Sequence, residues 1–351
     1  MKTIKKIFKY LFIGILLIVL GFITWLLIPG KNYNLIETPR KSTQYWELNT
    51  GSKIAYTHVQ SKTDSVKATL IYLHGGPGGY ITNLDIEKFE EISNQGYEIY
   101  LYDQIGCGLS ERLKDPEEYS IARHIADLKE IINKVNPKRT VLIGQSWGGM
   151  FGAYYAATYP LEINKLILTC PGGIMPADTI AQSKYASSLV SGLTSIDKRI
   201  DKINAEIQNS MSLKEKLWLA GASLIGSPIL ISDDKVDGVF NNLSKIFEKG
   251  MVCDSTLKSE PGGRPGMYCS IFTTKSLEKL STNIRTKIVT YKNPVLILKG
   301  ECDYIPWRET YEYKALFPNS ELKVIKSAGH SIARENKKDL VKEILSFLEK
   351  E

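Results

Sequence analysis

The chain has 351 residues and a formal net charge of +7, and 43% of its residues are hydrophobic and 24% charged. These values are typical of a globular protein, and the length suits one large α/β domain with an insertion, or two domains. Four lysines without any acid lie in residues 1–30, so the rest of the chain carries only +3. Because no basic stripe is interleaved with aromatic residues, we expect no nucleic-acid partner.

The N-terminal segment differs from the rest of the chain. After the lysines, residues 10–28 are uncharged and almost wholly apolar, and as a helix they would span about 28 Å, enough to cross a bilayer. A cleaved signal peptide is the alternative, but its apolar region is usually shorter, and residues 25–30 do not resemble a cleavage site. We therefore expect residues 1–30 to be a single-pass membrane anchor with its N-terminus in the cytoplasm and the rest of the chain outside it.

Residues 31–43 are expected to form a polar linker, after which short apolar strands alternate with helices. The strands are expected as a hairpin at residues 45–59 and at residues 68–73, 97–102, 140–145, 164–169, 294–298 and 321–325. The helices are expected at residues 117–134, 147–159, 308–317 and 333–350.

This alternation predicts the α/β class, with a mostly parallel sheet and helices on both faces. Residues 171–290 interrupt it, because they are helical and polar and show no strand. We expect residues 44–170 and 291–351 to form the core and residues 171–290 a helical cap. The cap would cover the carboxyl ends of the strands, where such folds bind ligands.

Residues 144–148 read Gly-Gln-Ser-Trp-Gly, between an apolar strand and an apolar helix. In this context the G-x-S-x-G pattern is typical of a nucleophile elbow, which lifts Ser146 above the end of the sheet. The glycines suit it because backbone segments pass close on both sides. A Gly/Ser turn without catalytic function is the alternative.

A serine hydroxyl needs a base to take its proton. Of the four histidines, His330 is the candidate, because its loop follows the last strand and lies at the same edge of the sheet as Ser146. His58 lies within a strand, His74 opens a glycine loop, and His124 is expected at a solvated helix position.

Asp303 follows the strand at residues 294–298 and is the candidate acid that orients His330, with Glu301 as the alternative. The order Ser, Asp, His along the chain is that of an α/β-hydrolase. Backbone N–H groups of Trp147 and of Gly76, in the glycine loop at residues 74–79, are candidates for stabilising an oxyanion. A phosphate-binding role for that loop lacks the necessary Lys-Ser/Thr pair. No metal or organic cofactor is needed for this chemistry.

Three motifs carry a family resemblance over roughly residues 68–170 and 290–350. The HGGPG sequence at residues 74–78, the DQxGxGxS sequence at residues 103–110 and the SWGG sequence at residues 146–149 resemble those of proline iminopeptidases in the α/β-hydrolase superfamily. Ile105 and Gln145 depart from the family's Arg and Gly, and the cap shows no matching stretch. The resemblance implies an aminopeptidase that releases an N-terminal residue, such as proline, from short peptides.

In that family, glutamates of the cap bind the substrate's α-amino group. The candidates here are Glu206, Glu215, Glu248, Glu260 and Glu278. An esterase or amide hydrolase for small uncharged substrates is the second hypothesis, and it predicts an apolar pocket. A binding protein with an inactive hydrolase fold is the third. Epoxide hydrolases and haloalkane dehalogenases are disfavoured, because they use a carboxylate nucleophile.

The five cysteines include no CxxC pair and no cluster with the spacing of a metal site. Outside the cytoplasm, Cys253 and Cys269 could form a disulfide, since both lie in the middle segment. Five buried thiols are the alternative.

Overall fold

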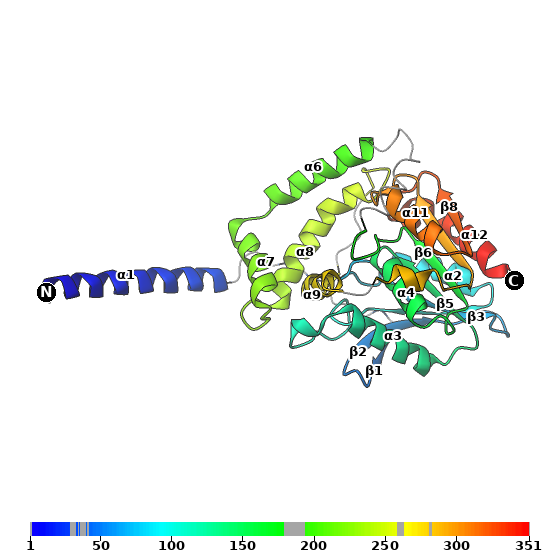
Figure 1. The fold of residues 1–351 in the computed structure, drawn as a ribbon, viewed down its shortest axis with the longest axis horizontal. Helices are drawn as coiled ribbons and strands as arrows, with labels where there is room; N and C mark the ends of the chain where they lie inside the picture. Colours follow the sequence, from blue (N-terminus) through cyan, green and yellow to red (C-terminus); the bar gives the residue numbers. More distant parts are fainter. Residues whose placement is uncertain are drawn as a thin grey trace.

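The computed structural model describes residues 2–28, 33, 35, 40, 42–178, 194–257, 263–280 and 283–350. Its centre is an eight-stranded sheet with the order β1-β2-β4-β3-β5-β6-β7-β8 (Figure 1). The first two strands form a hairpin, and β2 runs antiparallel to β4, while every pair from β4 to β8 is parallel. The strands are β1 (Thr43–Glu47), β2 (Lys53–Val59), β3 (Ala68–Leu73), β4 (Tyr97–Tyr102), β5 (Thr140–Gln145), β6 (Lys165–Thr169), β7 (Val295–Gly300) and β8 (Ser320–Ile325).

Helices cover both faces of the sheet, as expected. Successive side chains of a strand point to opposite faces, so Leu70 and Tyr72 join one apolar cluster while Ile71 and Leu73 join the other. The first cluster includes side chains of α2 and α12, and the second those of α3, α4, α10 and α11. These helices are α2 (Asn83–Ser93), α3 (Ile121–Val135), α4 (Trp147–Thr158), α10 (Arg285–Ile288), α11 (Trp307–Leu316) and α12 (Ile332–Glu349).

Among the described residues between β6 and β7, four further α-helices lie in residues 194–257 and 263–280, which we refer to as the helical insertion. Arg112 of the core forms an ion pair with the fully buried Asp237 of α8, which fixes the insertion to the core. In Figure 1, α7 and α8 lie between α1 and the sheet. The helices are α6 (Thr194–Ser210), α7 (Leu213–Ile225), α8 (Asp233–Phe247) and α9 (Met267–Glu278).

Helix α1 (Lys2–Leu27) extends away from the rest of the molecule (Figure 1). Its segment from Ile4 to Leu27 is long and apolar enough to cross a membrane. A signal sequence near the N-terminus would meet the same criteria, so length and composition support either role.

Two expectations were wrong. Cys253 is disulfide-bonded to Cys302, a residue of the core, and Cys269 is a buried free thiol, so both the Cys253–Cys269 pairing and its alternative of five buried thiols are wrong. His124 is not solvated: it is 2% exposed, and its Nε2 lies 3.1 Å from the Thr273 hydroxyl of α9. Both errors have one cause, because the sequence pattern did not show where the insertion packs against the core.

Candidate active site

Ser146 lies in a sharp turn between β5 and α4, with φ 55° and ψ −120°. A positive φ is uncommon for a residue with a side chain, and such strain is typical of a nucleophile elbow. Close backbone contacts require the two glycines of the motif: a Cβ at Gly144 would collide with the Gly148 carbonyl, and one at Gly148 with the Leu73 carbonyl. The local sequence therefore explains this turn.

Asp303 and His330 lie on the loops that follow β7 and β8, at the same edge of the sheet as Ser146. His330 Nδ1 lies 2.7 Å from Asp303 Oδ1, and both side chains are buried. Because an ionised carboxylate only accepts hydrogen bonds, Nδ1 carries the proton and Nε2 is the nitrogen that would take a proton from serine. Glu301, the alternative acid, is exposed and accepts a hydrogen bond from the Ser327 backbone.

Ser146 and His330 line the same cavity, although no hydrogen bond joins them among the described residues. Such bonds are often long without substrate and shorten in the reacting complex. The structure thus brings the three predicted residues to one site and makes one of the two hydrogen bonds that a triad needs.

Lys299 is a second partner of Asp303, which the sequence analysis did not identify. Its side chain is fully buried, and its Nζ donates to Asp303 Oδ2 at 2.6 Å. Burial alone would raise the pKa of Asp303, but charge and hydrogen bonds from His330 and Lys299 lower it to about 2. Asp303 therefore stays ionised at neutral pH.

Cys170, Asp303 and His330 are the group of described residues whose spacing could hold a metal ion, since their ligand atoms lie within 4.8 Å of one another. Their chemistry does not suit a cation. Burial raises the pKa of the Cys170 thiol well above its usual value, which disfavours the thiolate that a metal requires. The ammonium of Lys299 already occupies Asp303 Oδ2. The arrangement fits a proton-transfer pair better than a metal site.

Two backbone segments flank Ser146. Trp147 is the first residue of α4, so its N–H has no partner within the helix. On the other side, a Cβ at Gly75 would lie 3.3 Å from the Ser146 Cβ, so the loop with Gly76 passes next to the serine. Gly76 and Trp147 thus lie on the two segments from which an oxyanion would receive hydrogen bonds.

The DQ pair at residues 103–104 holds this loop in place. His74 Nε2 accepts the Gln104 backbone N–H at 3.0 Å, which leaves Nδ1 as the donor to the Gly75 carbonyl at 2.8 Å. The Gln104 side-chain oxygen accepts the Trp147 indole N–H at 2.8 Å. Asp103 accepts the Ile81 backbone N–H at 2.7 Å. Burial lowers the pKa of His74, so its ring stays neutral and holds the loop through these two hydrogen bonds.

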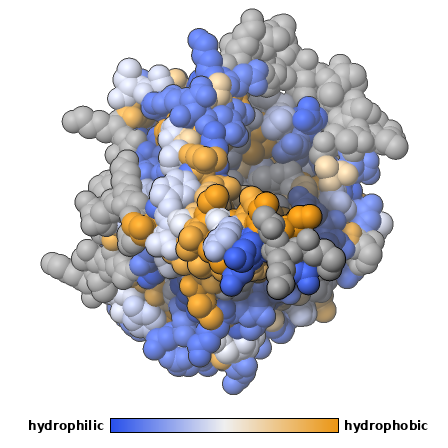
Figure 2. Space-filling view, turned by 90° about the vertical axis from the view of Figure 1, so that its left-hand side faces the viewer, coloured by the Kyte–Doolittle hydropathy of each residue, from blue (hydrophilic) through white to orange (hydrophobic). Residues whose placement is uncertain are grey.

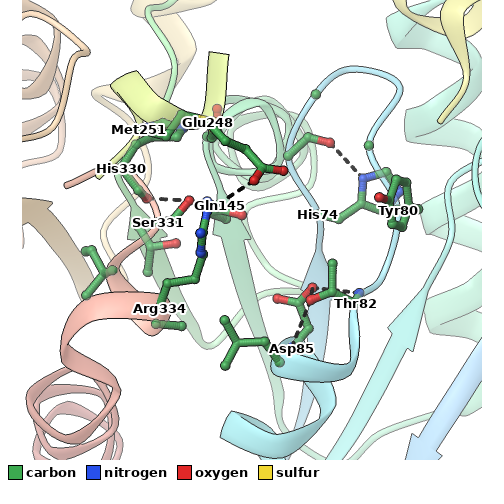
Figure 3. A pocket seen from close by; sticks show the side chains of 18 of the residues that line it. His74, Tyr80, Thr82, Asp85, Gln145, Glu248, Met251, His330, Ser331 and Arg334 are labelled. Carbon is green, nitrogen blue, oxygen red and sulfur yellow. Dashed lines mark hydrogen bonds and ion pairs between the residues drawn. The ribbon is translucent and has the colours of Figure 1, made fainter. Parts of the chain in front are cut away.

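The cavity above Ser146 has a volume of about 380 Å³ and is bordered by the loop at residues 74–79, α2, α8 and the start of α12. Figure 3 shows the side chains of Glu248 and Arg334 pointing toward each other at this cavity. Arg334 Nη1 lies 3.4 Å from Glu248 Oε2. At another part of the wall, Asp85 is paired with Lys88 at 2.6 Å. Much of the remaining lining is apolar, namely Leu84, Phe89, Phe240, Phe247, Met251, Ile332, Ala333, Leu340 and Ile344.

Comparison with known proteins supports the fold described above. A family model for the alpha/beta hydrolase fold matches residues 68–191. The solved proline iminopeptidase of Mycobacterium smegmatis superposes with a TM-score of 0.56 at 18% identity, covering 88% of this chain and 97% of that one. An esterase from Exiguobacterium antarcticum superposes with a TM-score of 0.57 at 17% identity, covering 87% and 99%. The chain has the α/β-hydrolase fold.

Among curated proteins, this chain is 29% identical over 201 residues to the proline iminopeptidase of Clostridioides difficile, covering 54% of this chain and 65% of that protein. The first curated relatives are all named proline iminopeptidase, and the matches span between 36% and 65% of their lengths. The chain resembles proline iminopeptidases, and the resemblance supports a hydrolase.

Of the four candidate glutamates among the described residues, one lies at the cavity. Glu248 lines it and is paired with Arg334. Glu206 pairs with Lys249 at the surface, Glu215 caps α7, and Glu278 is exposed. Glu260 lies outside the described residues.

Tyr304 is a further cavity residue that the sequence analysis missed. Its ring lies 4.6 Å from the His330 ring. Burial raises the pKa of Tyr304, and a hydrogen bond with Ser146 partly opposes that rise. Its position directly after Asp303 was the available signal, because neighbouring residues of one loop share an edge of the sheet.

Gln145, the departure from the family's glycine, also has a contact at the site. Its side-chain amide donates to the His330 carbonyl at 3.4 Å (Figure 3). The larger residue therefore connects the turn at Ser146 to the loop that carries His330.

Proposed function

We propose that the protein is a serine hydrolase that acts through an acyl-enzyme at Ser146. The observation that carries this proposal is the Asp303–His330 hydrogen bond at the cavity that Ser146 lines. His330 would take the serine proton as Oγ attacks the substrate carbonyl, and would then give it to the leaving group. The backbone N–H groups of Gly76 and Trp147 would stabilise the oxyanion. His330 would then take a proton from a water molecule that attacks the acyl group, and would return this proton to Ser146 Oγ as the acyl group leaves.

The leading substrate proposal is an N-terminal residue released from a short peptide, as an aminopeptidase of the proline iminopeptidase type would do. The three motifs and the curated relatives support it. Residues 171–290 would form the cap, and Glu248 is the described candidate for contacting a substrate ammonium.

An esterase or amide hydrolase for small uncharged substrates is the second proposal. It is favoured by the charge pairing in the cavity, since Glu248 and Asp85 each have a cationic partner. An ammonium group would have to compete with Arg334 for Glu248. The apolar lining described above suits an uncharged acyl group equally well.

For location, we propose that α1 is an uncleaved anchor and that the catalytic domain lies outside the cytoplasmic membrane. The Cys253–Cys302 disulfide supports this, because disulfides persist in oxidising compartments. The lysines before the apolar run support a cytoplasmic N-terminus.

The test is hydrolysis by the purified full chain of proline p-nitroanilide, its N-acetyl analogue and p-nitrophenyl butyrate, with Ser146→Ala as control. Turnover of the free-amine anilide alone, lost in Ser146→Ala, supports the aminopeptidase. Turnover of the ester alone supports the second proposal. If Ser146→Ala retains the activity, the acyl-enzyme proposal is wrong. If nothing is hydrolysed, a fluorophosphonate probe that labels wild type but not Ser146→Ala separates an active enzyme from an inactive binding protein.

A further inference from the structure

The end of α7 and the turn after it expose large apolar side chains. Leu224, Ile225, Ile229 and Leu230 are 85%, 62%, 95% and 49% exposed, and we refer to these four residues as the apolar tip. Residues 217–232 contain no charged residue. Single exposed apolar residues are ordinary, but four within seven positions form a patch that calls for a partner.

The apolar tip is held in an ordered turn. Gly226 ends α7 in the left-handed conformation, and the Leu230 N–H donates to the Ser227 carbonyl at 3.1 Å. Ile231 is 6% exposed, and its carbonyl accepts the Tyr268 hydroxyl at 2.7 Å. The turn is thus fixed to α9, and its exposed side chains are presented by the fold.

The last turn of α1 ends against α7 and α8. The Trp218 indole N–H donates to the Leu26 carbonyl at 3.0 Å, and Lys235 donates to the Leu27 carbonyl at 3.1 Å. These donors satisfy carbonyls that a helix end leaves without partners, and the lysine charge is favourable there. Trp218 is 1% exposed, so the end of α1 is packed into the insertion.

The apolar tip lies near this contact. Leu224 follows Trp218 by six residues, which is about 9 Å along a helix. Figure 2 is viewed from the side on which α1 projects, and the hydrophobic side chains in the middle of this face include those of α1 itself, which points toward the viewer. If α1 crosses a bilayer, the end of α1 lies at the bilayer surface, and the tip lies at the end of α7, the helix whose Trp218 contacts it.

We propose that the apolar tip is a second membrane contact, by which the helical insertion rests on the bilayer that α1 crosses. This inference rests on the proposed anchoring role of α1. Tryptophan and lysine beside an apolar surface are typical of the interfacial region, and Trp218, Lys214 and Lys235 surround the end of α1. A lipid surface fits better than a second protein chain, because the tip ends the same helix whose Trp218 bonds the end of α1.

The contact would fix the orientation of the cavity. Helix α8 begins three residues after the tip, and it carries Phe240 and Phe247 of the cavity wall. The wall formed by the insertion would thus be the part of the site nearest the membrane.

The test uses the full chain in phosphatidylcholine–phosphatidylglycerol vesicles, with a fluorophore on a cysteine introduced by Ile229→Cys. The native free thiols Cys107, Cys170 and Cys269 are buried, so the new thiol is labelled selectively. The matched control is Leu161→Cys, because Leu161 is also 95% exposed. It precedes β6 and so lies at the amino ends of the strands, opposite the edge that carries Ser146. Gly14→Cys reports on α1, where an added side chain meets no other atom within 4 Å.

We expect a lipid-borne nitroxide to quench the Ile229 label at least threefold more than the Leu161 label, and aqueous iodide to show the opposite order. Equal behaviour of these two labels, with a lipid-quenched Gly14 label, overturns the tip contact and leaves the anchor intact. Shielding of the Ile229 label from both quenchers indicates cover by another protein copy and also overturns it. A Gly14 label that lipid does not quench refutes the anchor and the tip contact together. Hydrolysis is not part of the readout, so its absence leaves these outcomes unchanged.

Discussion

Cys253 of the helical insertion is disulfide-bonded to Cys302, the residue directly before Asp303. Two further contacts join the same regions. The Ser331 N–H donates to the Met251 carbonyl at 3.1 Å, and Glu335 accepts the backbone N–H groups of both Cys253 and Gly329. The insertion is therefore tied to both loops that carry the proposed acid and base, and its position and the geometry of those loops are coupled.

We expect the double variant Cys253→Ser/Cys302→Ser to unfold at lower temperature and to hydrolyse substrate more slowly. The bond closes a loop across a sequence separation of 49 residues. Loops of this size contribute roughly 2–4 kcal/mol to stability, largely by restricting the unfolded chain. Thermal unfolding and kcat/KM, each measured with and without a reductant, provide the check. The reductant should affect wild type but not the double variant. An equal response of the two proteins would contradict a role for this bond.

Lys299→Met should lower both stability and activity. The substitution retains an apolar chain of similar length but removes the ammonium that donates to Asp303. Breaking a buried ion pair typically costs about 3–5 kcal/mol, because the remaining charge loses its partner. We expect kcat/KM to fall as well, because Lys299 no longer holds Asp303 in position beside His330. Lys323→Met, at an exposed position of β8, is the control and should leave kcat/KM and the unfolding temperature unchanged.

Asp303 should make the protein sensitive to acid. Its pKa is about 2 in the folded protein, below the value of 3.8 expected when the chain is unfolded. A depressed pKa contributes stability that is fully present above pH 3.8 and is lost as the pH falls toward 2. The shift corresponds to about 2 kcal/mol. The free energies of unfolding of wild type and Asp303→Asn, measured across pH 2–6, should become equal at the acid end. A difference in stability that stays constant with pH would contradict this linkage.

The fold and the elbow were predictable because their signals are local. Apolar strands, alternating helices and the glycines around Ser146 are visible in short stretches of sequence, and the predicted strands match the observed ones closely. Helix α2 was not predicted, although Thr82 and Asp85 form a capping box at its start. Its apolar face is short, so the periodicity was weak.

The support around the site could not be predicted, because it depends on contacts between distant segments. Lysine side chains are usually exposed, yet that of Lys299 is fully buried beside Asp303. Cys302 meets Cys253 only because the insertion folds back over the core. A strand-end lysine four residues before a candidate acid is a weak signal on its own, since most lysines are exposed.

Tyr304→Phe should lower kcat with little effect on KM. The substitution removes the hydroxyl beside Ser146 and keeps the ring that packs against His330. A hydrogen bond between neutral groups contributes about 1 kcal/mol, so we expect a loss in kcat of roughly fivefold to tenfold. Tyr268→Phe is the control, because it removes a buried hydroxyl of the insertion, bonded to Ile231, away from the cavity. If both variants lose kcat equally, the effect of Tyr304 is structural. A loss confined to Tyr304→Phe, with an unchanged unfolding temperature, places its hydroxyl among the groups that position the nucleophile.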